Sequence, residues 1–177
     1  MKERLRNLIR EVSLTFGDFL LASGERSNYY IDLRMTSLHP EGLALASSLL
    51  ADMLREDVDA VGGMGLGAYP LVSGIILETY RRGRPVKGFL IRKEKKAYGR
   101  GKKVEGWLER GQRVALVEDV VTTGGSLLRA AGEVEAAGGE VVQVLAVLDR
   151  GGGPRITPLY PFSSIFTVEE ILGGKDG

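Results

Sequence analysis

Short apolar segments alternate along this chain with longer segments in which apolar residues recur at helical spacing. The short segments are rich in β-branched residues, which is typical of strands buried on both faces, and they lie at 58–62, 86–91, 113–117 and 141–148. The longer segments fit amphipathic helices, and they lie at 2–15, 40–56, 70–80 and 127–137. This alternation predicts one α/β domain over residues 1–177, with a mainly parallel central sheet flanked by helices.

The two ends of the chain depart from this alternation. Phe16-Gly17-Asp18 breaks the first helical pattern, and residues 19–32 then predict two short strands around a polar turn. Residues 159–172 predict a last strand and a short helix that packs on the sheet. We expect about residues 1–40 to form a small cap over the edge of the sheet.

Composition narrows the class of protein. The 177 residues are 44% apolar and 27% charged, which is ordinary for a soluble globular domain with a substantial core. A formal net charge of +1 gives no general reason to expect a nucleic-acid partner. Cysteine is absent, which excludes disulfides and thiolate sites and fits a reducing compartment, so we expect a cytoplasmic protein.

One uncharged segment, at 60–77, approaches the length of a membrane-spanning helix. Its repeated glycines and Pro70 instead favour a strand, a loop and a helix. The start of the chain, Met1–Arg4, is charged and lacks the apolar core of a signal peptide. We therefore expect no membrane partner.

The segment from Arg113 to Ser126 carries the clearest candidate chemistry. Glu118 and Asp119 stand where its apolar strand pattern ends, and Val120-Val121-Thr122-Thr123-Gly124-Gly125-Ser126 leads into a helix. Free N–H groups at a helix start bind phosphate, and glycines let the main chain approach the anion. Carboxylates accept hydrogen bonds from the vicinal hydroxyls of a sugar. The segment thus predicts a cradle for ribose 5-phosphate; the plain alternative is a buried strand that ends in two acids before a capped helix.

A second glycine-rich loop, Gly63–Pro70, lies between a predicted strand and a predicted helix. It matches neither the phosphate loop of nucleotide hydrolases nor the dinucleotide-binding fingerprint, because it has no Gly-Lys-Ser/Thr and its third glycine comes too early. A second anion site and tight packing of small residues are both open interpretations of this loop.

A basic segment follows the strand at 86–91. Seven of the twelve residues at 92–103 are basic and one is acidic, and two glycines lie among them. Three interpretations remain open: a solvated loop, a nucleic-acid patch with Tyr98 as a stacking residue, and a cationic lid that closes over a polyphosphate. Two phosphate-binding loops in the same chain favour the lid.

Asp149 and Arg150 follow the last buried strand. In open parallel sheets, ligands bind beyond the carboxyl ends of the strands. An arginine at this edge can bind a carboxylate through two hydrogen bonds, whereas the alternative is a surface ion pair between the two neighbours.

The run from Arg113 to Ser126 resembles the signature of the type I phosphoribosyltransferases, which bind phosphoribosyl pyrophosphate (PRPP). The match covers the apolar strand, both acids, two apolar residues and Thr-Thr-Gly-Gly-Ser. Residues 19–32 resemble the N-terminal segment of the orotate phosphoribosyltransferases, and 92–99 and 149–150 are also similar to that family. Purine phosphoribosyltransferases would share 113–126 but lack the segment at 19–32.

The resemblance implies a set of site residues. Catalysis is assigned to Lys93, Lys96 and Asp119. PRPP binding is assigned to Arg92, Lys93, Lys96, Tyr98, Glu118, Asp119, Val120, Val121, Thr122, Thr123, Gly124, Gly125 and Ser126, with Gly65, Leu66 and Gly67 as the pyrophosphate loop. Orotate binding is assigned to Ser23, Gly24, Tyr30, Ile31, Thr122 and Arg150.

The reaction implied by the resemblance joins orotate to PRPP and gives orotidine 5′-monophosphate and pyrophosphate, a step of pyrimidine biosynthesis. Mg²⁺ is the implied cofactor, and the implied assembly is a homodimer whose basic loop serves the neighbouring subunit. The transition state is expected to be oxocarbenium-like. No protein nucleophile is needed, so catalysis would be electrostatic and positional.

Two positions depart from many bacterial members of the family, which carry lysines where Ala22 and Leu66 stand. Arg26 or the basic loop is expected to compensate for these lysines. A histidine is also frequent in the family where Tyr98 stands. Two rival functions remain: a phosphoribosyltransferase for another base, such as a purine, and a regulatory RNA-binding protein of the same fold that senses PRPP.

Overall fold

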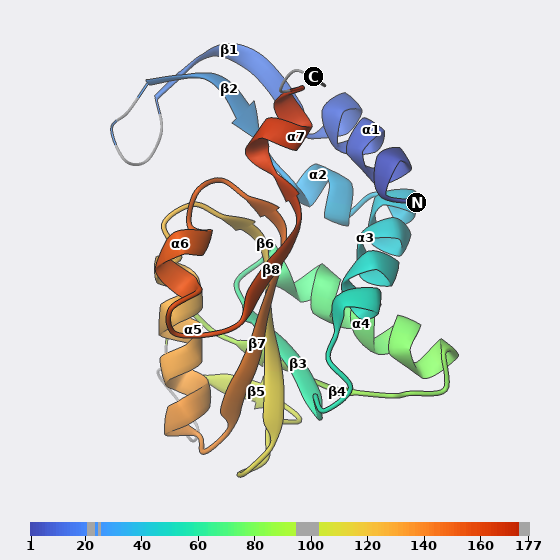
Figure 1. Cartoon of the computed structure of the whole chain (residues 1–177), viewed down its shortest axis with the longest axis vertical. Helices are drawn as coiled ribbons and strands as arrows, with labels where there is room; N and C mark the ends of the chain where they lie inside the picture. The colour runs from blue at the N-terminus through green and yellow to red at the C-terminus, as the bar shows by residue number, and fades with distance from the viewer. Residues whose placement is uncertain (21–23, 25, 95–102, 174–177) are drawn as a thin grey trace.

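The computed structural model describes residues 1–20, 24, 26–94 and 103–173. Its centre is a six-stranded sheet in the order β5-β4-β3-β6-β7-β8 (Figure 1). The strands are β3 (Ala60–Met64), β4 (Lys87–Ile91), β5 (Val104–Gly106), β6 (Arg113–Val121), β7 (Glu140–Asp149) and β8 (Phe162–Thr167). All neighbours run parallel except β4 and β5, which confirms the predicted α/β fold with a mainly parallel sheet.

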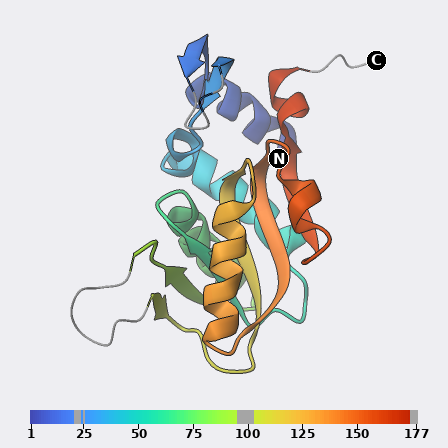
Figure 2. The same cartoon turned by 90° about the vertical axis from the view of Figure 1, so that its left-hand side faces the viewer.

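Helices cover both faces of this sheet (Figures 1 and 2). α3 (Pro40–Met53) and α4 (Ala68–Arg81) lie on one face, and α5 (Gly125–Ala136) with the short α6 (Gly153–Ile156) lies on the other. The side chains of β6 divide between the two layers: Ala115 and Val117 join the core under α3 and α4, while Val114 and Leu116 join the core under α5. Burial on both faces explains the unbroken apolar run in the sequence.

The N-terminal segment forms a separate layer at one end of the sheet (Figure 1). It comprises α1 (Lys2–Val12), the antiparallel strands β1 (Leu14–Leu20) and β2 (Arg26–Ile31), and α2 (Arg34–Ser37). The last helix, α7 (Val168–Leu172), packs beside α1, where the Arg10 guanidinium donates to the carbonyl of Ile171 at 2.7 Å. We call residues 1–37 the cap.

Several boundaries predicted from the sequence were wrong. The first helix ends at Val12 instead of 15, and Phe16-Gly17-Asp18 lies inside β1, where the pairing register shifts between Phe16 and Phe19. The break in the helical pattern therefore marks an irregular strand. β6 runs on through both acids to Val121, so Glu118 and Asp119 lie within the strand. None of the described helices is long and apolar enough to cross a membrane.

Candidate active site

A cavity of about 680 Å³ lies between the cap and the carboxyl ends of the central strands. Its walls come from the end of β2 and the start of α2, the loops after β3 and β4, the start of α4, the end of β6 with the residue after it, and the residue after β7. They comprise Tyr30, Ile31, Asp32, Leu33, Arg34, Gly65, Leu66, Gly67, Tyr69, Arg92, Lys93, Glu94, Asp119, Val120, Thr122 and Arg150. The position matches the edge at which open parallel sheets bind ligands.

The phosphate turn, which we define as residues 122–126, borders this cavity through Thr122. A smaller hollow of about 40 Å³ lies inside the turn, and its lining includes Thr123, Gly124 and Ser126. Gly124 has φ of +73° and precedes the first residue of α5, so the turn uses a backbone conformation that favours glycine. The hollow thus sits at the start of a twelve-residue helix, where unpaired N–H groups and the helix dipole favour an anion.

The two acids of β6 are in different environments. Alternation along the strand buries Glu118, which is 8% exposed, and places Asp119 on the cavity wall. Burial, followed by the adjacent charge of Asp119, raises the pKa of Glu118 to about 9, although Lys93 acts in the opposite direction. Glu118 therefore holds a proton at neutral pH when no ligand is bound. The Asp119 carboxylate accepts a hydrogen bond of 2.9 Å from the N–H of Val120.

The loop of Gly65, Leu66 and Gly67 lies against the same acid. A Cβ atom on Gly67 would overlap the carboxylate of Asp119. Gly65 has φ of +89°, and the Lys93 side chain passes over it, with Cε 3.1 Å from the place where a Cβ would be. The glycines thus allow an acid from β6 and a lysine from the loop after β4 to approach one main-chain turn.

The first two residues of the basic segment at 92–103 are cations that lie on the cavity wall. Arg92 and Lys93 line the wall, and the Arg92 Nε donates to Glu105 at 3.2 Å. The predicted residues Lys96 and Tyr98 lie outside the described residues, as does Ser23 of the predicted orotate site.

Arg150 and Asp149 do not form the ion pair considered as an alternative from the sequence. The Asp149 Oδ1 instead accepts from the N–H groups of Gly151, Gly152 and Gly153, at 2.9, 2.8 and 3.1 Å. The guanidinium carbon of Arg150 lies 5.0 Å from the centre of the Tyr29 ring, and its Nε is buried without a hydrogen-bond partner among the described residues. Arg150 therefore lines the cavity as a cation that pairs with no carboxylate among the described residues.

Most of the remaining predicted positions meet at these two hollows. Tyr30, Ile31, Thr122 and Arg150 share the large cavity with the glycine loop, while Val121, Glu118 and Gly125 line the small one. Gly24 is exposed and does not belong to either lining. The sequence prediction missed Asp32, Arg34 and Tyr69, which line the large cavity; nothing in the local pattern distinguishes them from ordinary surface residues.

Comparison with known proteins agrees with this geometry. Residues 39–172 match the family model described as the phosphoribosyl transferase domain. An orotate phosphoribosyltransferase of Rhodopseudomonas palustris (strain BisB18) is 40% identical, with 97% of this chain and 96% of that protein covered. One of Aquifex aeolicus (strain VF5) is also 40% identical, with 97% of each chain covered.

Solved structures extend the likeness to three dimensions. The crystal structure of Mycobacterium tuberculosis H37Rv orotate phosphoribosyltransferase in complex with Fe(III) dicitrate has a TM-score of 0.85 and 37% identity, and covers 96% of this chain and 98% of that one. The structure of the same enzyme in complex with PRPP has a TM-score of 0.80 and 33% identity, with the same coverage. Because the family model matches residues 39–172 and two orotate phosphoribosyltransferases are 40% identical over 97% of the chain, this protein belongs to the orotate phosphoribosyltransferases of the phosphoribosyl transferase family.

Proposed function

We propose that this protein transfers the 5-phosphoribosyl group from PRPP to orotate, giving orotidine 5′-monophosphate and pyrophosphate in pyrimidine biosynthesis. The observation that carries the proposal is that two adjoining hollows bring together the turn at 122–126, the acids Glu118 and Asp119, and Arg150, which pairs with no carboxylate among the described residues. A purine base has no carboxylate for Arg150, and a formal net charge of +1 does not favour the RNA-binding alternative.

The PRPP half of the site is assigned to β6 and its turn. The residues from Thr122 to Ser126 hold the 5′-phosphate in the small hollow, because N–H groups and hydroxyls there provide donors. Asp119 and Glu118 accept hydrogen bonds from the ribose hydroxyls. Gly65, Leu66 and Gly67, together with Arg92 and Lys93, line the wall that faces the pyrophosphate.

The orotate half lies under the cap. Arg150 binds the orotate carboxylate, since its guanidinium supplies donors in a planar fork. Tyr30 and Ile31 form the adjacent wall of the cavity and contact the face of the base. Thr122 borders both hollows, so base and phosphate are held at opposite sides of one residue.

The chemistry needs no covalent intermediate with the protein. The ring nitrogen N1 of orotate attacks C1 of the ribose while the bond from C1 to the pyrophosphate oxygen breaks. The bonding pair leaves with pyrophosphate, which also takes up the proton that N1 gives up. Positive charge develops on the sugar ring in the transition state, where the carboxylate of Asp119 stabilises it. Lys93 stabilises the charge on the departing pyrophosphate.

Mg²⁺ fits this site as an ion that enters with PRPP. The described residues contain no group of three or more metal-ligating side chains, and Mg²⁺ commonly keeps its waters and binds substrate phosphates with only one or two carboxylates. Asp119 and Glu94 are carboxylates on the cavity wall that are available for such a contact, whereas Asp32 is bound by Arg34 at 2.8 Å. When bound, the ion neutralises charge on the pyrophosphate.

A homodimer with shared sites is part of the proposal. Lys96 belongs to the basic segment that begins at the sheet edge beside the cavity, and we assign it to the site of the neighbouring subunit. Lys96→Ala should lower kcat far more than it weakens orotate binding. Mixing Lys96→Ala with a subunit inactivated at Asp119 should restore part of the activity if loops are exchanged between subunits.

The direct test is to mix the protein with PRPP, Mg²⁺ and orotate and to follow the loss of orotate absorbance. PRPP-dependent loss supports the function. Turnover of adenine, guanine or hypoxanthine, but not orotate, would contradict the assignment of the base site while keeping that of the PRPP site. No turnover of any base, together with RNA retention that falls steeply with salt, would favour the regulatory alternative.

A further inference from the structure

The contact between Tyr29 and Arg150 joins the cap to the sheet at the orotate end of the cavity. Tyr29 belongs to β2, and Arg150 follows β7. The guanidinium carbon lies 5.0 Å from the centre of the Tyr29 ring, within the range of a cation–π interaction. Tyr29 does not line the cavity, so it reaches a ligand only through Arg150.

We propose that Tyr29 is a positioning residue for the proposed reaction. Its ring holds the Arg150 guanidinium so that the hydrogen-bonding edge of the guanidinium faces the orotate carboxylate. This inference rests on the proposed function. A guanidinium stacked on a ring face keeps its N–H groups at the edge, where a planar carboxylate can bind them.

Among the described residues, Tyr29 is the group that fixes the Arg150 side chain, because the other contacts near Arg150 involve its main chain or its neighbour Asp149. The Arg150 main chain is fixed by its N–H, which donates to the carbonyl of Val121 at 2.8 Å. Asp149 is occupied by backbone N–H groups, and the Arg150 Nε has no hydrogen-bond partner among the residues that the structure describes. With its carboxylate neighbour engaged elsewhere, the guanidinium rests on the aromatic ring.

Tyr29 is itself held firmly in β2. Its carbonyl accepts a hydrogen bond of 2.7 Å from the hydroxyl of Ser27, it pairs with Phe16 across the hairpin, and it packs against the core cluster beneath the cap. The next residue, Tyr30, lines the cavity. Successive side chains of a strand point to opposite faces, so β2 supplies a wall of the cavity with one tyrosine and a support for Arg150 with the other.

The test compares variants at position 29 by their KM for orotate. Tyr29→Leu and Tyr29→Met remove the ring and should raise this KM about five- to thirty-fold, the range of a partly desolvated cation–π contact. Tyr29→Phe keeps the ring and should stay within about twofold. Phe16→Leu, which removes a ring from the exposed cross-strand partner, is the matched control and should also stay within about twofold.

Two further measurements separate positioning from general support of the cap. In an Arg150→Gln background, Tyr29→Leu should change the KM for orotate by less than about twofold, because the guanidinium that Tyr29 positions is then absent. The four proteins form a double-mutant cycle, which isolates the coupling between the two residues. Fluorinated phenylalanines at position 29 should raise the KM stepwise as fluorine weakens the negative ring face. PRPP affinity should not change in any of these variants.

Three outcomes would overturn the inference: an unchanged KM in both ring-removed variants, a loss that persists undiminished in the Arg150→Gln background, or a fluorinated series without a trend. Absence of orotate turnover by the unmodified protein would contradict the proposed function instead. The two failures are therefore distinguishable.

Discussion

The carboxylate of Asp119 occupies the space that a side chain on Gly67 would need. β6 supplies the acid, and the glycine directly precedes α4 in the loop after β3. Because β3 and β6 are parallel neighbours, their carboxyl ends meet at the same edge of the sheet and bring the two residues together. The glycine is thus required by an acid that lies about fifty residues further along the chain.

Gly67→Ala should displace Asp119 and raise the KM for PRPP about ten- to a hundredfold, since small displacements of a positioned group carry costs of this size. Steady-state kinetics checks this. Gly132→Ala is the matched control: it lies in α5 with open space around the added methyl group, and should leave the KM unchanged while stabilising the fold by about 0.5–1 kcal/mol. Equal KM values for the two variants would contradict the role given to Gly67.

Glu118 makes the stability of the free protein depend on pH. Its pKa is raised from 4.5 to about 9 in the folded state, so between these values the folded chain holds a proton that the unfolded chain releases. The free energy of unfolding should therefore fall as pH rises across this window.

Glu118→Gln removes this titration and should raise the free energy of unfolding at pH 8 by about 1–3 kcal/mol, with little change near pH 4.5. Urea unfolding at the two pH values measures the difference. Hydrogen bonds from the ribose hydroxyls favour the ionised form of Glu118 in the complex. The same substitution should therefore lower kcat/KM for PRPP about tenfold, because an amide oxygen replaces the carboxylate acceptor of the bound state. An equal gain in stability at both pH values would show that the effect comes from packing and not from the titration of Glu118.

Gly124 provides the positive φ that the phosphate turn requires. Gly124→Ala should destabilise the fold by about 1–2 kcal/mol and also weaken binding of ribose 5-phosphate, measured by calorimetry. Gly111→Ala is the control, because Gly111 has φ of +83° and open space around it but lies outside both hollows. It should show a similar loss of stability and unchanged binding; weakened binding there as well would point to a general effect of backbone strain.

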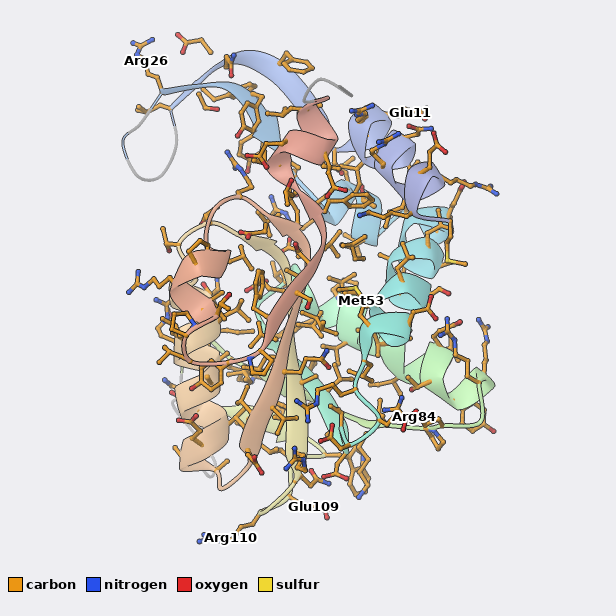
Figure 3. The ribbon with its side chains drawn as sticks, in the orientation of Figure 1. Glu11, Arg26, Met53, Arg84, Glu109 and Arg110 are labelled. Atoms are coloured by element: carbon orange, nitrogen blue, oxygen red, sulfur yellow. The ribbon has the colours of Figure 1, made fainter. Side chains whose placement is uncertain are left out.

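Arg34 and Arg26 are two cap arginines in contrasting positions. Arg34 lines the cavity and donates to both oxygens of Asp32 at 2.8 Å, whereas Arg26 pairs with exposed Asp18 and lies outside the cavity lining. Figure 3 shows Arg26 at the outer end of β2, directed away from the sheet. Arg34 is therefore the better-placed cation on the wall that also holds Leu66.

Arg34→Gln should raise the KM for PRPP about tenfold, because it removes a charged donor from the wall. Arg26→Gln should change it by less than about twofold, as expected for an exposed ion pair. The inhibition constant of free pyrophosphate gives a second comparison of the two variants. A larger effect of the Arg26 substitution would instead favour the sequence-based expectation that Arg26 compensates for the lysines absent at Ala22 and Leu66.

Local patterns were sufficient to predict the parallel sheet and the glycine-containing turn between β6 and α5. The burial of β6 on both faces produced a continuous apolar run, and the turn needed a fixed order of small residues after it. Contacts across the chain were less accessible to prediction. Asp32 and Arg34 become site residues only because the cap folds over the sheet, and no spacing in the sequence encodes that approach.

The errors in element boundaries have a similar origin. An acid normally marks the exposed end of a strand, yet Glu118 stays in β6 because pairing with β7 continues on to Val121. β5, α2 and α6 are each only three or four residues long, too short for a periodic pattern. Their positions depend on neighbours: β5, for instance, pairs with β4 at the edge of the sheet.

Because β6 lies inside the sheet, the PRPP half of the site should resist local unfolding more strongly than the orotate half under the cap. β6 is bonded to β3 on one side and β7 on the other, whereas β1 and β2 pair only with each other among the described strands. Amide hydrogens of β6 should exchange only when the whole domain unfolds, and those of the hairpin through smaller fluctuations. In mild denaturant the protein should therefore lose selectivity for the base before it loses its hold on ribose phosphate.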